Sequence, residues 1–139
     1  MYYAFRYVAS QKISHMILIG SDLPNLPPTH IKNAFQALTD HDVVLGPSLD
    51  GGYYLIALKN PDLRLFENIQ WGTEQVFIQT VKKIRLLNKT VSILNPWYDV
   101  DNLEQLRRLK IDLSNEPDPH IAQFTRKSLN TDIGRHLIK

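Results

Sequence analysis

The chain has 139 residues, a length that suits one domain with one modest core. Its 16 basic and 14 acidic residues give a net charge of +2, which is too balanced to favour a nucleic-acid-binding protein. Because the sequence has no cysteine, disulfides, thiolate catalysis and cysteine zinc sites are excluded, and a cytoplasmic location fits. No apolar run approaches the ~20 residues that a membrane span needs.

The first half of the sequence predicts two helices and three strands. Residues 2–11 have a helix-like spacing of aromatic side chains, and the apolar run 16–20 is typical of a strand buried on both faces of a parallel sheet. Pro28 suits the first turn of a helix whose apolar positions continue to Leu38. Two further apolar runs, at residues 42–47 and 53–58, predict strands that are separated by a segment with paired glycines.

The second half predicts helices around one more strand. Thr73 is placed to cap a helix whose core face runs over residues 76–87. Residues 90–94 predict a strand, and either Asp101 or Asn102 can cap the helix that follows.

That following helix has Glu104 or Gln105 at the capping-box position, and residues 119–129 predict a last short helix. Helices and strands therefore alternate along most of the chain. This order predicts an α/β layered fold with a mainly parallel sheet, in a single domain that spans residues 1–139.

Carboxylates follow three of the predicted strands, in residues 20–24, 46–53 and 98–101. Ligands of open α/β sheets bind beyond the carboxyl ends of the strands. A divalent cation such as Mg²⁺ commonly takes one or two carboxylates and completes its shell with water and substrate phosphates. Asp22 and Asp101 could hold such an ion, which would neutralise charge on a leaving diphosphate. The alternative role of Asp22 is to cap a turn or helix before Pro24, and that of Asp99 or Asp101 is to cap the helix that follows.

Two other polar segments also have two interpretations. Gly51 and Gly52 allow a ligand to approach the backbone closely, but a turn would use the same residues. Trp71 could stack on a sugar ring or base next to helix-end amides at Thr73, or it could be a core-rim side chain. The histidines have no metal-ligand spacing, and the sequence contains no P-loop, dinucleotide fingerprint or serine elbow.

Four segments together resemble a known family: IGSDLPNL, VVLGPSLDGGYYLIAL, WGT and YDVDNLEQL. They look like the GT-A-like glycosyltransferases known as rSAM/selenodomain-associated transferases, which are relatives of the MobA and CofC nucleotidyltransferases. The resemblance implies a Rossmann-like GT-A three-layer sandwich, a nucleotide or nucleotide-sugar substrate, and Mg²⁺ or Mn²⁺ as the metal.

The resemblance also implies residue roles. It places the metal ligands at Asp22, Asp99 and Asp101, with Asp101 favoured over Asp99 as the second ligand, and catalytic roles at Asp22 and Asp50. It assigns the signature loop to the acceptor or sugar side. The substrate-binding residues expected on this basis are Ser21, Asp50, Gly51, Gly52, Tyr53, Trp71 and Thr73.

Members of that family begin with a strand and a basic nucleotide-holding loop, which this sequence lacks, so we expect an incomplete GT-A domain. A missing first strand predicts an exposed sheet edge, through which copies of the chain could form a homo-oligomer. The favoured function is metal-dependent glycosyl transfer from a nucleotide-sugar. Nucleotidyl transfer of the MobA/CofC type and a non-catalytic remnant or interaction module stay open, as does the activity of this chain alone.

Overall fold

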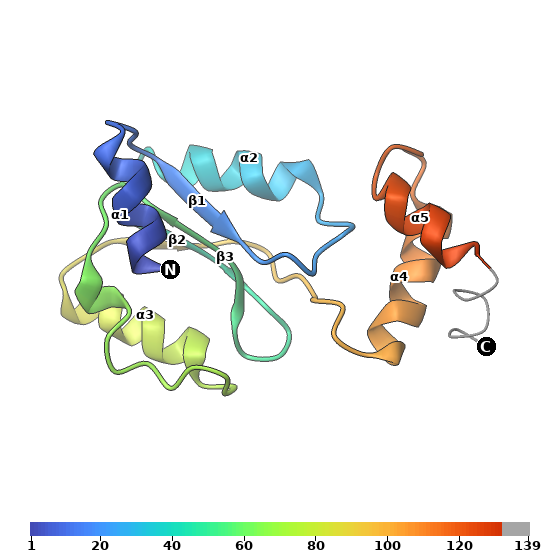
Figure 1. Cartoon of the computed structure of the whole chain (residues 1–139). Helices are drawn as coiled ribbons and strands as arrows, with labels where there is room; N and C mark the ends of the chain where they lie inside the picture. Colours follow the sequence, from blue (N-terminus) through green and yellow to red (C-terminus); the bar gives the residue numbers. More distant parts are fainter. Residues whose placement is uncertain (132–139) are drawn as a thin grey trace. The chain divides into compact units, whose positions relative to one another are not determined.

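The computed structural model describes residues 1–131 (Figure 1). Contacts divide the chain into two compact units. The first unit comprises residues 1–20 and 27–97, and the described part of the second comprises residues 21–26 and 98–131. No helix in residues 1–131 is long and apolar enough to cross a membrane.

The first unit is a four-stranded sheet with helices on both faces. In Figure 1, α2 lies on one face of the sheet and α3 on the other. All of the helices and strands predicted in this unit are present, and the short 3-10 helix η1 was not predicted. The elements are α1 (Tyr2–Ser10), β1 (Met16–Ile19), α2 (Pro28–Ala37), β2 (Val43–Pro47), β3 (Tyr53–Leu58), η1 (Leu63–Leu65), α3 (Val76–Leu86) and β4 (Val91–Ile93).

The strand order is β1-β3-β2-β4 and the sheet is mixed, so the prediction of a mainly parallel sheet was wrong. β3 runs antiparallel to both β1 and β2, whereas β2 and β4 are parallel. The cause is the length of the connections, because only residues 48–52 join β2 to β3 and a parallel crossover needs a dozen or more residues. β1, β2 and β4 still share one direction, so their carboxyl ends lie at the same end of the sheet.

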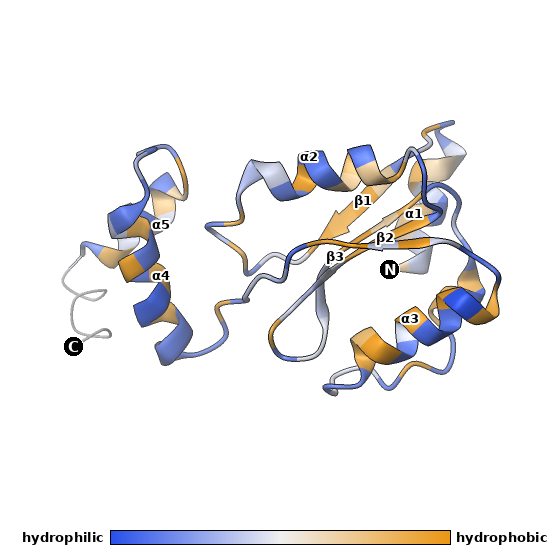
Figure 2. Ribbon diagram, turned by 180° about the vertical axis from the view of Figure 1, so that it is seen from behind, coloured by the Kyte–Doolittle hydropathy of each residue, from blue (hydrophilic) through white to orange (hydrophobic). Residues whose placement is uncertain are grey.

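One face of the sheet forms a core with α1 and α3. Leu45 and Ile56 are partners in the register of β2 and β3, and their exposed fractions are 0% and 1%. Phe5 of α1 and Ile84 of α3 belong to the same buried cluster. Figure 2 shows the strands as hydrophobic segments. β1 was expected to be buried on both faces, but it is an edge strand and Ile19 at its end is exposed.

The second unit contains the helices α4 (Leu103–Asn115) and α5 (Gln123–Leu129). Of the two residues predicted to cap α4, Asn102 is its N-cap, and Gln105 completes the capping box. The last predicted helix is confirmed in α5, which is shorter than the predicted segment. A small apolar core joins the two helices, and its buried members are Leu109, Leu113 and Leu129.

Candidate functional site

A cavity of about 520 Å³ lies in the first unit, between the loop after β2 and the segment before α3. Five of the seven predicted substrate-binding residues line it: Asp50, Gly52, Tyr53, Trp71 and Thr73. A volume of this size is typical of small-molecule sites, which occupy about 300–1,000 Å³. The loop that contains Gly52 and the segment that contains Trp71 and Thr73, each of which had two interpretations in the sequence, therefore meet at one cavity.

Backbone contacts hold the two walls of this cavity together. Gly51 has φ +90°, and a Cβ added there would lie 2.4 Å from the carbonyl oxygen of Glu74. The Phe77 N–H donates a hydrogen bond of 2.9 Å to the Gly51 carbonyl. Only glycine combines this dihedral with this close approach. Gly51 thus serves loop geometry, because it lets the loop after β2 pack on the segment that leads into α3.

Asp50 is the acidic residue of the loop. Its Oδ1 accepts a hydrogen bond of 2.9 Å from the Gly52 N–H, which fixes the carboxylate relative to the turn. The side chain is otherwise exposed at the cavity. Asp50 therefore combines a turn-forming contact with a carboxylate that a ligand can reach.

Thr73 does not cap α3, and this prediction was wrong. The N-cap is Gln75, which makes no side-chain capping bond. The Thr73 hydroxyl instead donates to the Gln70 carbonyl at 2.7 Å and accepts from the Gln75 N–H at 3.3 Å, so it closes a turn before the helix. Gly72, with φ +77°, places that turn outside the helix. The Trp-Gly-Thr segment consequently does not present helix-end amides.

The aromatic wall of the cavity is formed by Trp71 and Tyr53. Their rings meet edge to face with centroids 6.4 Å apart, and Trp71 is 45% exposed. Trp71 therefore leaves about half of its surface accessible at the cavity. Burial raises the pKa of the Tyr53 phenol, so this group stays protonated at neutral pH.

The predicted metal ligands lie in the second unit. The Val100 N–H donates a hydrogen bond of 3.0 Å to the Asp22 carbonyl, which holds residues 21–26 against residues 98–101. The Asp101 N–H donates to the Gln105 side-chain oxygen at 2.7 Å, so Asp101 immediately precedes the cap of α4. Asp22 is exposed, and its carboxylate makes no hydrogen bond within residues 1–131. Ser21 is exposed next to it.

Behind these carboxylates lies a buried polar network that the sequence did not reveal. The Asn25 Nδ2 donates to the Tyr98 hydroxyl at 2.8 Å, and that hydroxyl donates to an Asp112 carboxylate oxygen at 2.6 Å. Burial and then the Asp112 hydrogen bond raise the pKa of Tyr98 to about 12. Because Tyr98 gives its proton to Asp112, Asn25 must face it with its amide nitrogen, and the buried Asn25 Oδ1 has no hydrogen-bond partner within residues 1–131.

Comparison with known families decides the lineage. The model of the DUF2064 family, described as an uncharacterized protein conserved in bacteria, matches residues 1–73. This match covers more than half of the chain. The chain belongs to the DUF2064 family. No match is found among curated proteins.

A solved structure is similar to this DUF2064 chain over almost its whole length. It is a crystal structure from Desulfovibrio desulfuricans G20 of a "putative nucleotide-diphospho-sugar transferase". The two share 28% sequence identity with a TM-score of 0.85, over 99% of this chain and 59% of that chain. The DUF2064 chain thus spans about three fifths of that protein and has the mixed α/β fold of the nucleotide-diphospho-sugar transferase superfamily, as the motifs implied.

The second unit carries the carboxylates of Asp22, Asp99 and Asp101, which are the type of ligand that a hard divalent cation prefers. Within residues 1–131, no group of three or more His, Asp or Glu side chains is placed to hold a metal ion. Mg²⁺ and Mn²⁺ nevertheless often take only one or two carboxylates and draw their other ligands from water and substrate phosphates. In the DUF2064 chain, Asp22, Asp99 and Asp101 supply carboxylates of this kind, from segments that a hydrogen bond holds together.

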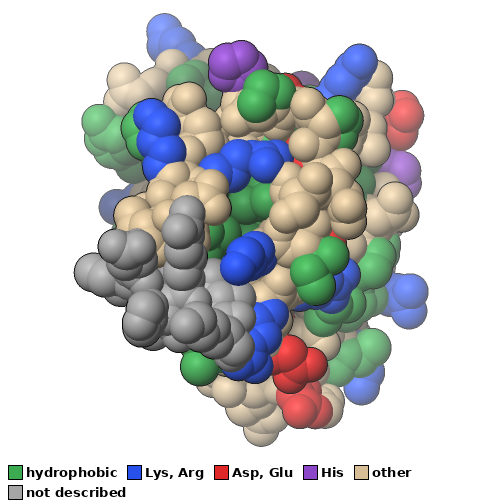
Figure 3. All heavy atoms as spheres, turned by 90° about the vertical axis from the view of Figure 1, so that its right-hand side faces the viewer, with side chains coloured by type: hydrophobic (Ala, Val, Ile, Leu, Met, Phe, Trp, Pro, Cys, Tyr) green, Lys and Arg blue, Asp and Glu red, His purple; other side chains and the backbone are tan. Residues whose placement is uncertain are grey.

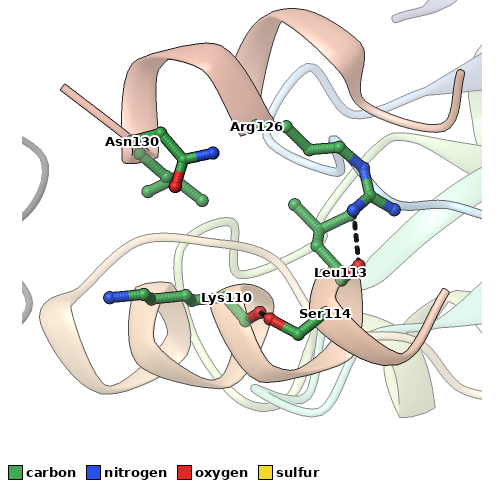
Figure 4. A pocket seen from close by; sticks show the side chains of 6 residues that line it. Lys110, Leu113, Ser114, Arg126 and Asn130 are labelled. Carbon is green, nitrogen blue, oxygen red and sulfur yellow. Dashed lines mark hydrogen bonds between the residues drawn. The ribbon is translucent and has the colours of Figure 1, made fainter. Parts of the chain in front are cut away.

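A smaller cavity of about 130 Å³ lies between α4 and α5 (Figure 4). The Arg126 guanidinium lines it and donates hydrogen bonds to the carbonyls of Leu113 at 2.5 Å and Ile121 at 2.9 Å. Arg126 is therefore used to close the α4–α5 connection. Lys110 lines the same cavity, and further Lys and Arg side chains lie on the face seen in Figure 3.

Proposed function

We propose that this chain is the part of a metal-dependent glycosyltransferase that binds a nucleotide-sugar and its acceptor, within the rSAM/selenodomain-associated group of the superfamily. The observation that carries the proposal is the cavity at which five of the seven expected substrate-binding residues meet. The similarity to a protein described as a nucleotide-diphospho-sugar transferase supports the class of reaction. The absence of cysteine fits a cytoplasmic location, which is part of the same proposal.

In this proposal the first unit binds the acceptor or sugar. Trp71 offers its exposed ring, and the Tyr53 ring lies edge to face beside it. Thr73 lines the same cavity, with its hydroxyl held in the turn before α3. The Asp50 carboxylate, held by the Gly52 N–H, accepts a hydrogen bond from an acceptor hydroxyl and takes its proton as the new glycosidic bond forms. Asp50 is thus the general base of the proposal.

The second unit would hold the metal. Asp22 and Asp101 are the proposed ligands, with Asp99 as an alternative to Asp101, and Ser21 lies beside Asp22 to contact the substrate. When bound, Mg²⁺ or Mn²⁺ would neutralise the charge of the leaving nucleoside diphosphate. Asn25 and Tyr98 support the loop of Asp22 from behind through their hydrogen bond.

The test is calorimetric titration of the intact protein with Mn²⁺, in the presence and absence of a panel of nucleotide-sugars. We expect the nucleotide-sugar to strengthen Mn²⁺ binding, because its phosphates complete the coordination shell. Asp22→Ala and Asp101→Ala should each weaken that binding by about tenfold or more. Asp40→Ala is the matched control, because Asp40 is an exposed aspartate of the first unit.

Absence of Mn²⁺ binding, or an Asp22→Ala protein that binds like the wild type, would overturn the proposed metal site. The products separate the two transfer reactions that share a metal and a diphosphate. Release of a nucleoside diphosphate supports glycosyl transfer, whereas release of pyrophosphate shows nucleotidyl transfer of the MobA/CofC type.

The position of β1 at one edge of the sheet, as described by residues 1–131, favours self-association as an additional property. β1 is an edge strand whose residues, Met16–Ile19, carry no charge or proline that would block strand pairing. We propose that two copies can pair through this edge to form a homo-oligomer. Sedimentation should show association at high concentration that Ile17→Lys abolishes, and a clean monomer throughout would refute it.

A further inference from the structure

We infer that the cavity of the first unit takes an acceptor with hydroxyl or amino groups and no phosphate, and that Glu74 sets this preference. The inference rests on the proposed function, since it treats the cavity as the acceptor side. It goes further by naming the chemical class of the acceptor and a residue that neither the motifs nor the resemblance assigned.

The charge of the cavity is the first argument. Asp50 and Glu74 line it, and no Lys, Arg or His side chain does. Neither carboxylate forms an ion pair within residues 1–131. Met1 also lines the cavity, so its α-ammonium faces two carboxylates. The two carboxylates outnumber this single positive charge, and their excess negative charge repels a phosphate group and attracts a hydroxyl donor or an ammonium group. The charge therefore selects against phosphorylated acceptors.

The two carboxylates are carried by segments with a fixed separation. Gly51 packs on the Glu74 backbone so closely that a Cβ would lie 2.4 Å from its carbonyl oxygen. The hydrogen bond from the Phe77 N–H to the Gly51 carbonyl locks the same two segments. A ligand thus meets Asp50 and Glu74 on a preformed backbone and does not have to order the loops, which lowers the entropic cost of binding.

The cavity also has an aromatic wall. Trp71 and Tyr53 give the cavity a flat apolar surface beside hydrogen-bond acceptors. A sugar ring has the matching pattern, because its C–H faces pack on aromatic rings while its hydroxyls donate to carboxylates. An amino group on such a ring adds an ammonium that both the carboxylates and the rings attract. Together the three features fit a sugar or amino sugar.

The charge of the cavity also affects which transfer reaction it can support. In a nucleotidyl transfer in which the acceptor attacks through its own phosphate, the carboxylates of Asp50 and Glu74 would repel that phosphate. Glycosyl transfer to a hydroxyl or amino group avoids this repulsion, because the attacking group is neutral or loses a proton to Asp50. The charge of the cavity therefore favours glycosyl transfer over the phosphate-accepting alternative.

The experiment is calorimetric titration of the intact protein with glucose, glucosamine and glucose 6-phosphate, repeated by the fluorescence of Trp71. We expect glucosamine to bind most tightly and glucose 6-phosphate about tenfold more weakly than glucose. Glu74→Gln should reduce the preference for glucosamine over glucose by about threefold, because an exposed charge interaction is lost. Glu67→Gln, an exposed glutamate outside the cavity, should bind all three like the wild type.

Trp71→Phe confirms that the fluorescence change reports on this cavity, since it should remove that change while calorimetry still detects binding. Glucose 6-phosphate binding as tightly as glucose would overturn the inference. So would the absence of binding by all three probes, or a Glu74→Gln protein with unchanged preferences. These titrations need neither metal nor nucleotide, so they can fail while the Mn²⁺ titration at Asp22 succeeds, and the reverse outcome is equally distinct.

Discussion

The two units of the chain are stabilised by different kinds of interaction. In the first, the fully buried strand residues of β2 and β3 pack in one continuous apolar cluster with α1 and α3. In the second, three leucines form a small core, and a capping box and the Asn25–Tyr98–Asp112 network add directional bonds. The first unit therefore depends mainly on filled volume, whereas the second depends more on the position of single polar atoms.

We expect the two units to differ most in the free energy of unfolding that each loses when a core side chain is truncated. Ile56 is 1% exposed in the central strand β3, so Ile56→Ala should lower the free energy of unfolding of the first unit by about 4 kcal/mol. Leu109 is fully buried in the small core of the second unit, where the surroundings can collapse, so Leu109→Ala should cost about 2 kcal/mol there.

Amide hydrogen exchange measures both changes separately. Ile56→Ala should reduce protection in β2 and β3, and Leu109→Ala should reduce it in α4. Equal losses in both units from either substitution would contradict the division into two units with different cores.

Two glycines in the segments that form the cavity should differ next most strongly in their effect on stability. Gly51 and Gly72 both have positive φ, but a Cβ at Gly51 would clash with the Glu74 backbone, whereas one at Gly72 meets no atom within 4 Å. Gly51→Ala should therefore cost about 3 kcal/mol, from backbone strain and from the clash. Gly72→Ala should cost about 1 kcal/mol, from strain alone. Urea denaturation compares them, and equal midpoints would show that the two walls are not locked as described.

The helices and strands were predictable because their signals are local. The periodicity of apolar residues and the Asn102–Gln105 capping box each lie within a few residues, and the structure confirms them. Strand direction is not local. β3 is buried from Tyr54 to Leu58 because it is a central strand of the sheet, and such a strand has the same apolar sequence in a parallel or an antiparallel sheet. The short Asp50-Gly51-Gly52 connection was the available signal for a hairpin.

Only those residues of the candidate site that belong to a recognisable motif could be predicted from the sequence. Motif resemblance selected Asp50, Tyr53 and Trp71, which the structure places at one cavity. Glu74 lies next to the Trp-Gly-Thr motif, but nothing in its sequence context distinguishes it from other exposed glutamates. The Asn25–Tyr98 hydrogen bond joins residues 73 positions apart, so only the folded chain reveals it.

Removal of the Tyr98 hydroxyl oxygen should destabilise the polar network of the second unit. Tyr98→Phe removes the hydroxyl that accepts from Asn25 and donates to Asp112, and it leaves the Asn25 Nδ2 without its partner in a buried position. We expect a loss of about 2 kcal/mol, measured by chemical denaturation. Tyr7→Phe is the matched control, because Tyr7 is exposed on α1. A Tyr98→Phe protein as stable as this control would show that the network adds nothing.

The smallest expected effect is a pH dependence that arises in the first unit. His30 Nδ1 lies 2.5 Å from the Tyr54 hydroxyl, which donates to the Asn95 carbonyl, and burial lowers the pKa of His30 below 6.5. The unfolded chain then binds a proton at a higher pH than the folded chain does. Stability should therefore be complete above about pH 6.5 and decline as the pH falls toward the lowered pKa.

The contribution of Asp42 to stability changes over a separate, more acidic pH range. Hydrogen bonds from the backbone and side chain of Thr90 lower the pKa of Asp42 below 3.8, so its contribution is present above that value and is lost only on further acidification. Denaturation curves between pH 3 and 8 should show His30→Asn removing the decline near pH 6 and Asp42→Asn removing only the acidic one. If His30→Asn leaves the upper decline intact, another group must titrate there, because the imidazole would no longer be present to account for it.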